Sequence, residues 1–126
     1  MTKYKFYFFL FLLGALLVNP SIVLAQGNDY MWQAAIAKTS FMTNINVDKE
    51  SGRIVAGWTE IGGKLYELNV RIMGEELLRE NVKARVRERL PSGQGWGAPQ
   101  VNIELTQATE AAIYDRARAL YDNGLN

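Results

Sequence analysis

The stretch RIVAGWTEIGGKLYELNVRI, residues 53–72, decides the fold of this chain of 126 residues. Apolar and polar side chains alternate strictly over 66–72, which predicts a strand with one buried face. A second half-buried strand is predicted over 53–59, and Gly62-Gly63 between the two strands is typical of a tight hairpin turn. The side chains predicted to face the core are Ile54, Ala56, Trp58, Tyr66, Leu68, Val70 and Ile72.

A helix is predicted before this hairpin, over residues 30–38. Asn28 or Asp29 can cap its first turn, because a short polar side chain accepts a hydrogen bond from the free backbone N–H groups there. A turn at 48–52, rich in polar residues and ending in glycine, then leads into the first strand. The apolar stripe of the helix, at helical spacing, consists of Trp32, Ala35 and Ile36.

A second helix is predicted at the C-terminal end of the chain. Thr106 is its expected N-cap, and Asn123-Gly124 is its expected stop. A short last strand is predicted just before it, over 101–105, where apolar residues again alternate. The predicted core face of the helix consists of Ile113, Ala117 and Leu120.

Residues 75–90 fit two interpretations. Apolar residues recur every fourth position from Leu78 to Leu90, and Glu75 lies four residues before Arg79, which favours a helix. From Val82 onward, however, apolar and basic residues alternate, which favours a strand. The following segment, 91–99, contains three glycines and two prolines and is predicted to be a loop.

The first 25 residues have the pattern of a secretory signal. Lys3 and Lys5 precede the apolar run 6–18, and Val23 and Ala25 provide the small residues that a signal peptidase requires. This run is too short to span a bilayer, which needs roughly 20 apolar residues. We therefore expect residues 1–25 to be a signal peptide and 26–126 a single domain, exported and periplasmic; an uncleaved signal would instead tether the domain to the membrane.

The composition limits the possible partners and chemistry. Arg and Lys number 14 and Asp and Glu 13, a near-neutral balance that argues against nucleic acid as a partner. The chain contains neither Cys nor His, so it has no disulfide, no zinc ligands of the usual kind and no side chain that titrates near neutral pH. No catalytic, metal-binding or cofactor-binding residue and no cofactor are expected, and a hydrolase that relies on carboxylates alone, such as Glu75 with Glu76, is the least favoured function.

Six short motifs together resemble a family of exported alphaproteobacterial envelope proteins catalogued as a domain of unknown function. The resemblance covers nearly the whole mature chain, and no catalytic residues are established for that family. It implies that the segment 82–89 is a strand rather than a helix. Members of the family are often lipoproteins, whereas this chain has no cysteine to acylate. The motifs, in order, are Tyr30-Met31-Trp32-x-Ala34, Ser40-Phe41-Met42, Ala56-Gly57-Trp58, Leu78-Arg79, a Gly-x-Gly-Trp loop, and Glu110-x-x-Ile113-x-x-Arg116-Ala117-Arg118-x-Leu120.

These elements predict an α+β fold with an N-terminal helix, an antiparallel sheet of three to four strands and a C-terminal helix packed on one sheet face. The opposite face is then open to solvent and basic. Arg71 and Arg79 are able to extend this basic face, and Trp96 lies in the glycine-rich loop beside it. Four side chains on one face of the predicted strand, about 6.8 Å apart, form the core of the predicted binding surface: Lys83, Arg85, Arg87 and Arg89.

Two functions remain in competition beside the hydrolase. The first is a non-catalytic envelope module for binding or scaffolding, whose basic face and Trp96 contact an envelope protein or an anionic envelope component. The second is a carrier of a small apolar ligand, held in a pocket between helices and sheet that Trp32, Trp58 and Tyr66 would line. In either case, membrane contact is expected to be transient or to depend on an uncleaved signal.

Overall fold

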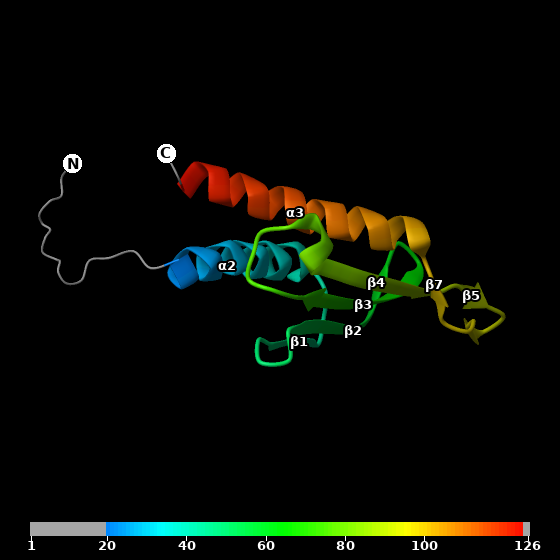
Figure 1. Ribbon diagram of the computed structural model, residues 1–126. Coiled ribbons are helices and arrows are strands. Elements are labelled where there is room, and N and C mark those ends of the chain that lie inside the picture. Colours follow the sequence, from blue (N-terminus) through cyan, green and yellow to red (C-terminus); the bar gives the residue numbers. More distant parts are fainter. Residues whose placement is uncertain (1–19, 125–126) are drawn as a thin grey trace, which may run out of the picture.

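A computed structural model of the protein describes residues 20–124 and gives an α+β fold (Figure 1). Most of the predicted signal peptide lies outside these residues. The elements are α2 (Pro20–Thr39), β1 (Ile45–Asp48), β2 (Arg53–Ile61), β3 (Lys64–Ile72), the short 3₁₀ helix η1 (Arg79–Asn81), β4 (Val82–Arg89), β5 (Pro91–Ser92), β6 (Gly95–Trp96), β7 (Gln100–Val101) and α3 (Ile103–Gly124).

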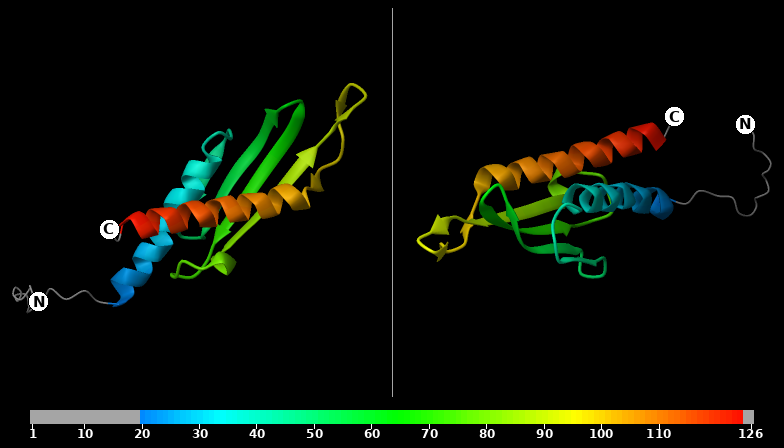
Figure 2. Two further views of the ribbon diagram at one scale, coloured as in Figure 1. Left: turned by 90° about the horizontal axis from the view of Figure 1, so that it is seen from above. Right: turned by 180° about the vertical axis from the view of Figure 1, so that it is seen from behind.

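The main sheet has five antiparallel strands in the order β1-β2-β3-β4-β7. Both helices lie on the same face of this sheet and cross each other there (Figures 1 and 2). The predicted fold class is therefore confirmed, with five strands instead of three to four. The additional strand is β1, whose alternation in sequence is weak, and all four of its residues are exposed.

The hairpin β2–β3 forms around Gly62 and Gly63, as predicted. Both glycines have positive φ angles, 61° and 82°, which a two-residue hairpin turn requires. The strand β2 also contains a bulge between Ala56 and Thr59. Because one extra residue reverses the facing of the side chains that follow it, Trp58 lies on the outer face of the sheet. The prediction that Trp58 faces the core is wrong.

The core lies between the inner sheet face and the two helices. Of the predicted helix positions, Ala35, Ile113 and Ala117 are fully buried and Trp32 nearly so, Leu120 is half-buried, and Ile36 is 40% exposed. The buried apolar residues are Met31, Trp32, Ala34, Ala35, Met42, Ile54, Ala56, Leu68, Val70, Ile72, Val82, Val86, Ile113 and Ala117.

Several boundaries differ from the predictions. The helix α2 begins at Pro20, so Asn28 and Asp29 lie inside it and cap nothing. The helix α3 begins at Ile103 and not after Thr106, because the Asn102 side chain accepts a hydrogen bond from the Leu105 N–H at 2.9 Å. The predicted last strand is thereby reduced to the two residues of β7.

The ambiguous segment resolves into a strand. Val82–Arg89 forms β4, paired with β3 over its whole length, and only the three residues of η1 before it are helical. The predicted loop 91–99 contains a small hairpin, β5–β6, which extends beyond the end of the main sheet (Figure 1). No helix within residues 20–124 has the length and apolar character needed to cross a membrane.

Candidate binding site on the outer sheet face

A row of three cations crosses the outer face of the sheet. Arg53 of β2 pairs with Arg71 of β3, and Arg71 pairs in turn with Lys83 of β4. Arg85 follows two residues after Lys83 and lies opposite Asn69. All four cations are exposed. Together they surround a hollow of about 280 Å³, called here the basic hollow, which is lined by Arg53, Asn69, Arg71, Lys83, Ala84 and Arg85.

The cations of the basic hollow are unpaired within the part of the chain that the structure describes. None of the four forms an ion pair or a side-chain hydrogen bond there. Asp48 is the residue paired with Arg53 on β1, but its carboxylate accepts hydrogen bonds from the N–H groups of Glu50 and Ser51, at 3.1 and 3.3 Å. Hydrogen bonding from Ser51, and secondarily from Glu50, lowers the pKa of Asp48.

This arrangement favours the binding of an anion. Like charges directly opposite each other on neighbouring strands repel, which destabilises the sheet. An anion placed in the basic hollow would remove this repulsion. Arg offers a planar fork of N–H donors that matches carboxylate and phosphate oxygens, and Asn69 adds a neutral donor and acceptor.

In the other half of the outer face, the arginine side chains already have partners within the protein. The Arg87 Nε donates a hydrogen bond to Glu67 at 2.6 Å, and the Arg89 Nε donates one to the Gly97 carbonyl at 2.8 Å. Both guanidinium groups also lie 5.6 Å from the centroid of the Trp58 ring, within the range of a cation–π contact. These two arginines are therefore engaged in internal contacts.

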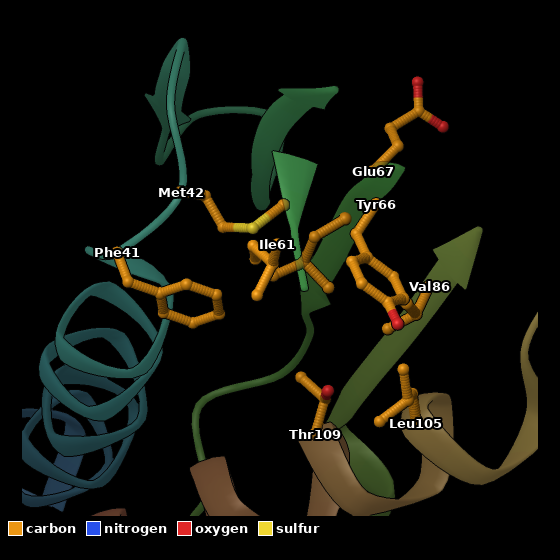
Figure 3. Close-up of a pocket in the computed structure, with 9 residues that line it drawn as sticks. Phe41, Met42, Ile61, Tyr66, Glu67, Val86, Leu105 and Thr109 are labelled. Carbon is orange, nitrogen blue, oxygen red and sulfur yellow. The ribbon is translucent and has the colours of Figure 1, made fainter. Parts of the chain in front are cut away.

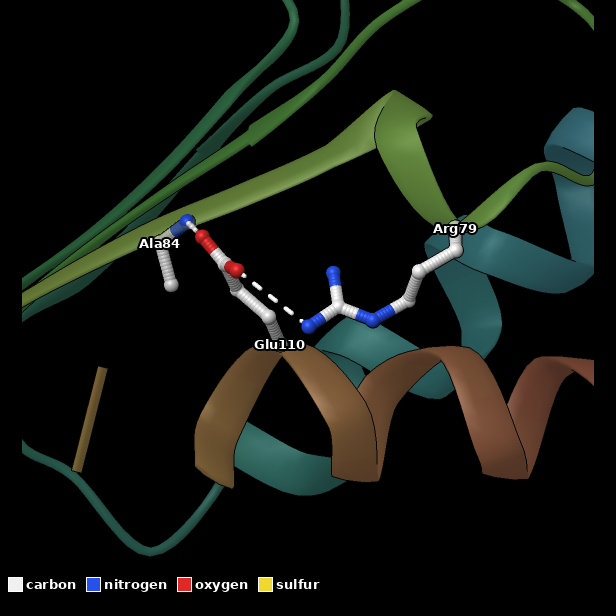
Figure 4. A network of polar contacts seen from close by, with 3 residues as sticks. All are labelled: Arg79, Ala84 and Glu110. Carbon is white, nitrogen blue, oxygen red and sulfur yellow. Dashed lines mark hydrogen bonds and ion pairs between the residues drawn. The ribbon is translucent and has the colours of Figure 1, made fainter. Parts of the chain in front are cut away.

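The two remaining residues of the predicted surface, Trp96 and Arg79, lie away from the basic hollow. Trp96 pairs with Pro91 in the β5–β6 hairpin and is half-buried, and this hairpin follows the end of β4 that is remote from Lys83 (Figure 1). Arg79 lies outside the sheet and forms an ion pair with Glu110 of α3 at 3.3 Å (Figure 4). The structure thus brings Lys83, Arg85 and Arg71 together and leaves Trp96 and Arg79 elsewhere.

Arg53 belongs to the basic hollow but was absent from the predicted surface. The polar–apolar alternation at Arg53 and Ile54 already indicates that Arg53 faces outward. What the sequence does not reveal is its neighbour, because a regular hairpin around Gly62-Gly63 would place Arg53 opposite Ile72. The bulge in β2 shifts the pairing by one residue and places it opposite Arg71.

Within residues 20–124, no three His, Cys, Asp or Glu side chains are grouped so that they could hold a metal ion. The family described as "Domain of unknown function (DUF3576)" matches residues 25–122. A protein of Rickettsia prowazekii (strain Madrid E), named "Uncharacterized protein RP420", is 24% identical over 101 residues, which are 78% of this chain and 60% of that relative. The chain therefore spans less than two thirds of the length of this relative. No solved structure matches the chain.

Proposed function

The chain belongs to the family described as a domain of unknown function, DUF3576, and on this premise we propose that it is a non-catalytic cell-envelope module that binds an acidic partner protein through the basic hollow. One observation carries the proposal: four exposed cations converge on one hollow with no acidic partner in the described part of the chain. The signal-like segment at residues 1–25 supports an exported location.

The form of the surface favours a protein over a membrane as the partner. The basic hollow lies on the broad face of a sheet, and its cations are spread over three neighbouring strands, a width of about 10 Å. None of the large apolar side chains that are exposed in the described part of the chain lines it. A surface that binds membranes usually inserts apolar side chains beside its basic ones, whereas an acidic protein surface requires only complementary charge.

The proposal is tested by site-specific photocrosslinking in cells. A photoreactive amino acid at Ser51, an exposed position two residues before Arg53, reports contacts at the basic hollow. The same amino acid at Gln107, exposed on α3, reports contacts on the helical side. We expect discrete protein adducts from position 51 and none of the same mass from position 107.

Charge reversal then identifies the contribution of the basic hollow. In the variant Lys83→Glu with Arg85→Glu, the adduct from position 51 is expected to fall at least tenfold, because the attraction becomes repulsion. The matched control is Lys38→Glu with Arg116→Glu, which changes the net charge equally on exposed positions of the two helices. An adduct that persists in the first variant, or is lost equally in the control, contradicts the proposal.

A further inference from the structure

An apolar cleft opens on the helical side of the sheet, away from the basic hollow. It has a volume of about 290 Å³ and lies between the segment that directly follows α2 and the N-terminal half of α3 (Figure 3). Its floor crosses three strands, from Ile61 of β2 through Leu68 of β3 to Val86 of β4. The lining residues are Phe41, Met42, Ile61, Tyr66, Glu67, Leu68, Val86, Leu105 and Thr109.

The pocket expected from the sequence therefore exists in a different form. Of the three aromatic residues predicted to line it, only Tyr66 does so. Trp32 is buried in the core, with 5% of its surface exposed, and Trp58 lies on the opposite face of the sheet. The walls are formed instead by Phe41 after α2 and by Leu105 and Thr109 on α3.

Among the residues that the structure describes, no charged group faces the interior of the cleft. Figure 3 shows the carboxylate of Glu67 directed away from the other lining side chains, and this carboxylate accepts a hydrogen bond from Arg87 on the outer face. Phe41, Ile61 and Leu105 remain 64%, 39% and 38% exposed at the cleft. Apolar side chains that converge in this way around a hollow mark a binding site more often than apolar side chains scattered over a surface.

Two hydroxyl groups give the cleft a polar end. Figure 3 shows the Tyr66 ring directed toward Leu105 and Thr109 of α3. Neither the Tyr66 hydroxyl nor the Thr109 hydroxyl forms a hydrogen bond with another residue that the structure describes. Both groups are therefore free to bind a polar atom at one end of a mainly apolar ligand.

We propose that this cleft binds a single unbranched acyl chain of about ten carbons. A methylene group is roughly as large as a water molecule, which occupies about 30 Å³, so the cleft accommodates about ten of them. Across the strands the floor spans two interstrand spacings, about 10 Å, and along them Ile61 is paired with Lys64, four residues or about 14 Å from Leu68. The floor therefore has room for such a chain in extended form, and the volume sets its length.

A partner peptide suits the cleft less well than an acyl chain. A bound peptide must satisfy its own N–H and C=O groups, and the lining side chains offer only two hydroxyls for this purpose. An acyl chain has no polar groups except at its head. The head group then lies at the α3 end, near Tyr66 and Thr109, with the tail directed toward Phe41.

The test is a titration with fatty acids of increasing length, followed by NMR of the methionine methyl groups. Met42 lines the cleft, whereas Met31 and Met73 do not and are internal references. With decanoate, we expect a saturable shift of the Met42 methyl resonance at one ligand per chain and no comparable shift of the other two. Affinity is expected to rise at least tenfold from hexanoate to decanoate and less than threefold from decanoate to tetradecanoate.

Two variants connect the binding to the cleft. Leu105→Trp fills the space from the α3 wall and is expected to weaken decanoate binding at least tenfold. Ile103→Trp places the same side chain on an exposed position of α3 that does not line the cleft, and it is expected to bind as the unaltered protein does. The proposal is overturned if decanoate produces no saturable Met42 shift, if all three methyl groups shift alike, or if both variants bind equally well.

This inference does not depend on the proposed function, because the cleft and the basic hollow lie on opposite sides of the sheet. The variant Lys83→Glu with Arg85→Glu is expected to bind decanoate normally, and Leu105→Trp is expected to retain the adduct from position 51. Each proposal can therefore fail while the other stands.

Discussion

At the scale of single residues, Glu110 connects the last helix to the sheet in two ways. Its Oε2 accepts a hydrogen bond from the Ala84 N–H at 2.8 Å, and its Oε1 accepts one from the Arg79 guanidinium at 3.3 Å (Figure 4). The first bond satisfies a backbone donor on the side of β4 that does not pair with β3. The second joins a side chain that is 42% exposed to one that is 14% exposed. Of the two, the bond to the backbone is expected to matter more, because an unsatisfied N–H is costly and a surface ion pair contributes little.

Replacing Glu110 separates these contributions. Glu110→Ala leaves the Ala84 N–H without its acceptor and is expected to reduce the free energy of unfolding by about 1–3 kcal/mol. Glu110→Gln keeps an acceptor oxygen and Arg79→Ala keeps the whole carboxylate, so each is expected to cost less than about 1 kcal/mol. Urea denaturation measures the three losses, and amide exchange at Ala84 should accelerate in Glu110→Ala alone. Equal losses in the Ala and Gln variants would contradict this assignment.

At the scale of secondary-structure elements, the bulge in β2 determines the composition of the outer face. The Gly57 N–H donates hydrogen bonds to the carbonyls of Thr43 and Asn44, at 3.2 and 3.4 Å, while the pairing of β2 with β3 is irregular there. One extra residue on β2 turns Trp58 outward and brings Arg53 opposite Arg71. The same bulge keeps Ile54 opposite Val70 in the core. The row of three cations (Arg53, Arg71 and Lys83), called here the cationic row, and the packed core therefore require the same one-residue shift in the pairing of β2 with β3.

The cationic row is expected to reduce the stability of the isolated protein. Arg71 is flanked by Arg53 on one strand and Lys83 on the other, so Arg71→Gln removes two repulsive contacts without disturbing buried side chains. We expect the free energy of unfolding to rise by about 0.2–1 kcal/mol, and the adduct formed at position 51 to decrease. Thermal or urea denaturation at low and high salt measures the first effect, which should shrink as salt screens the charges. A loss of stability in this variant would show that the row is not repulsive.

At the scale of the whole molecule, both helices cover one face of the sheet and leave the other open (Figure 2). This division separates the basic hollow from the apolar cleft by the thickness of the sheet. The two helices also contact each other directly, where Tyr30 and Tyr121 meet edge to face with their ring centroids 5.8 Å apart. Among residues 28–124, whose burial the structure describes, Met31 is the first residue of the buried core.

The position of the core predicts the effect of removing the leader. Among residues 28–124, whose burial the structure describes, the core starts at Met31, six residues after Ala25, so a chain that starts at Gln26 keeps all of these core residues and is expected to unfold cooperatively. Circular dichroism and urea denaturation of this chain measure its folding, and mass spectrometry of the exported protein measures its N-terminus. A chain from Gln26 that fails to fold would mean that residues before it belong to the domain, and an exported protein that retains Ala25 would contradict the predicted cleavage.

The sequence by itself determined the order of helix, sheet and helix, the central hairpin, and the face of α3 that is buried at Ile113 and Ala117. These features depend on local periodicity and on the turn-forming Gly62-Gly63, both of which act between residues close together in the chain. Local pattern alone slightly favoured a helix over 75–90, which is wrong for 82–89, and the resemblance to a known family favoured the strand that the structure contains there.

Only the tertiary structure decided which side chains meet. Contacts between separate elements determine that Trp58 faces outward and that Arg53 is opposite Arg71. They also determine that the Ala84 N–H donates its hydrogen bond to Glu110. Both the basic hollow and the apolar cleft are assembled from several elements in this way. Periodicity in sequence cannot reveal a one-residue shift in strand pairing, because the shift is stabilised by hydrogen bonds that the Gly57 N–H donates to the carbonyls of a different segment, residues 43–44.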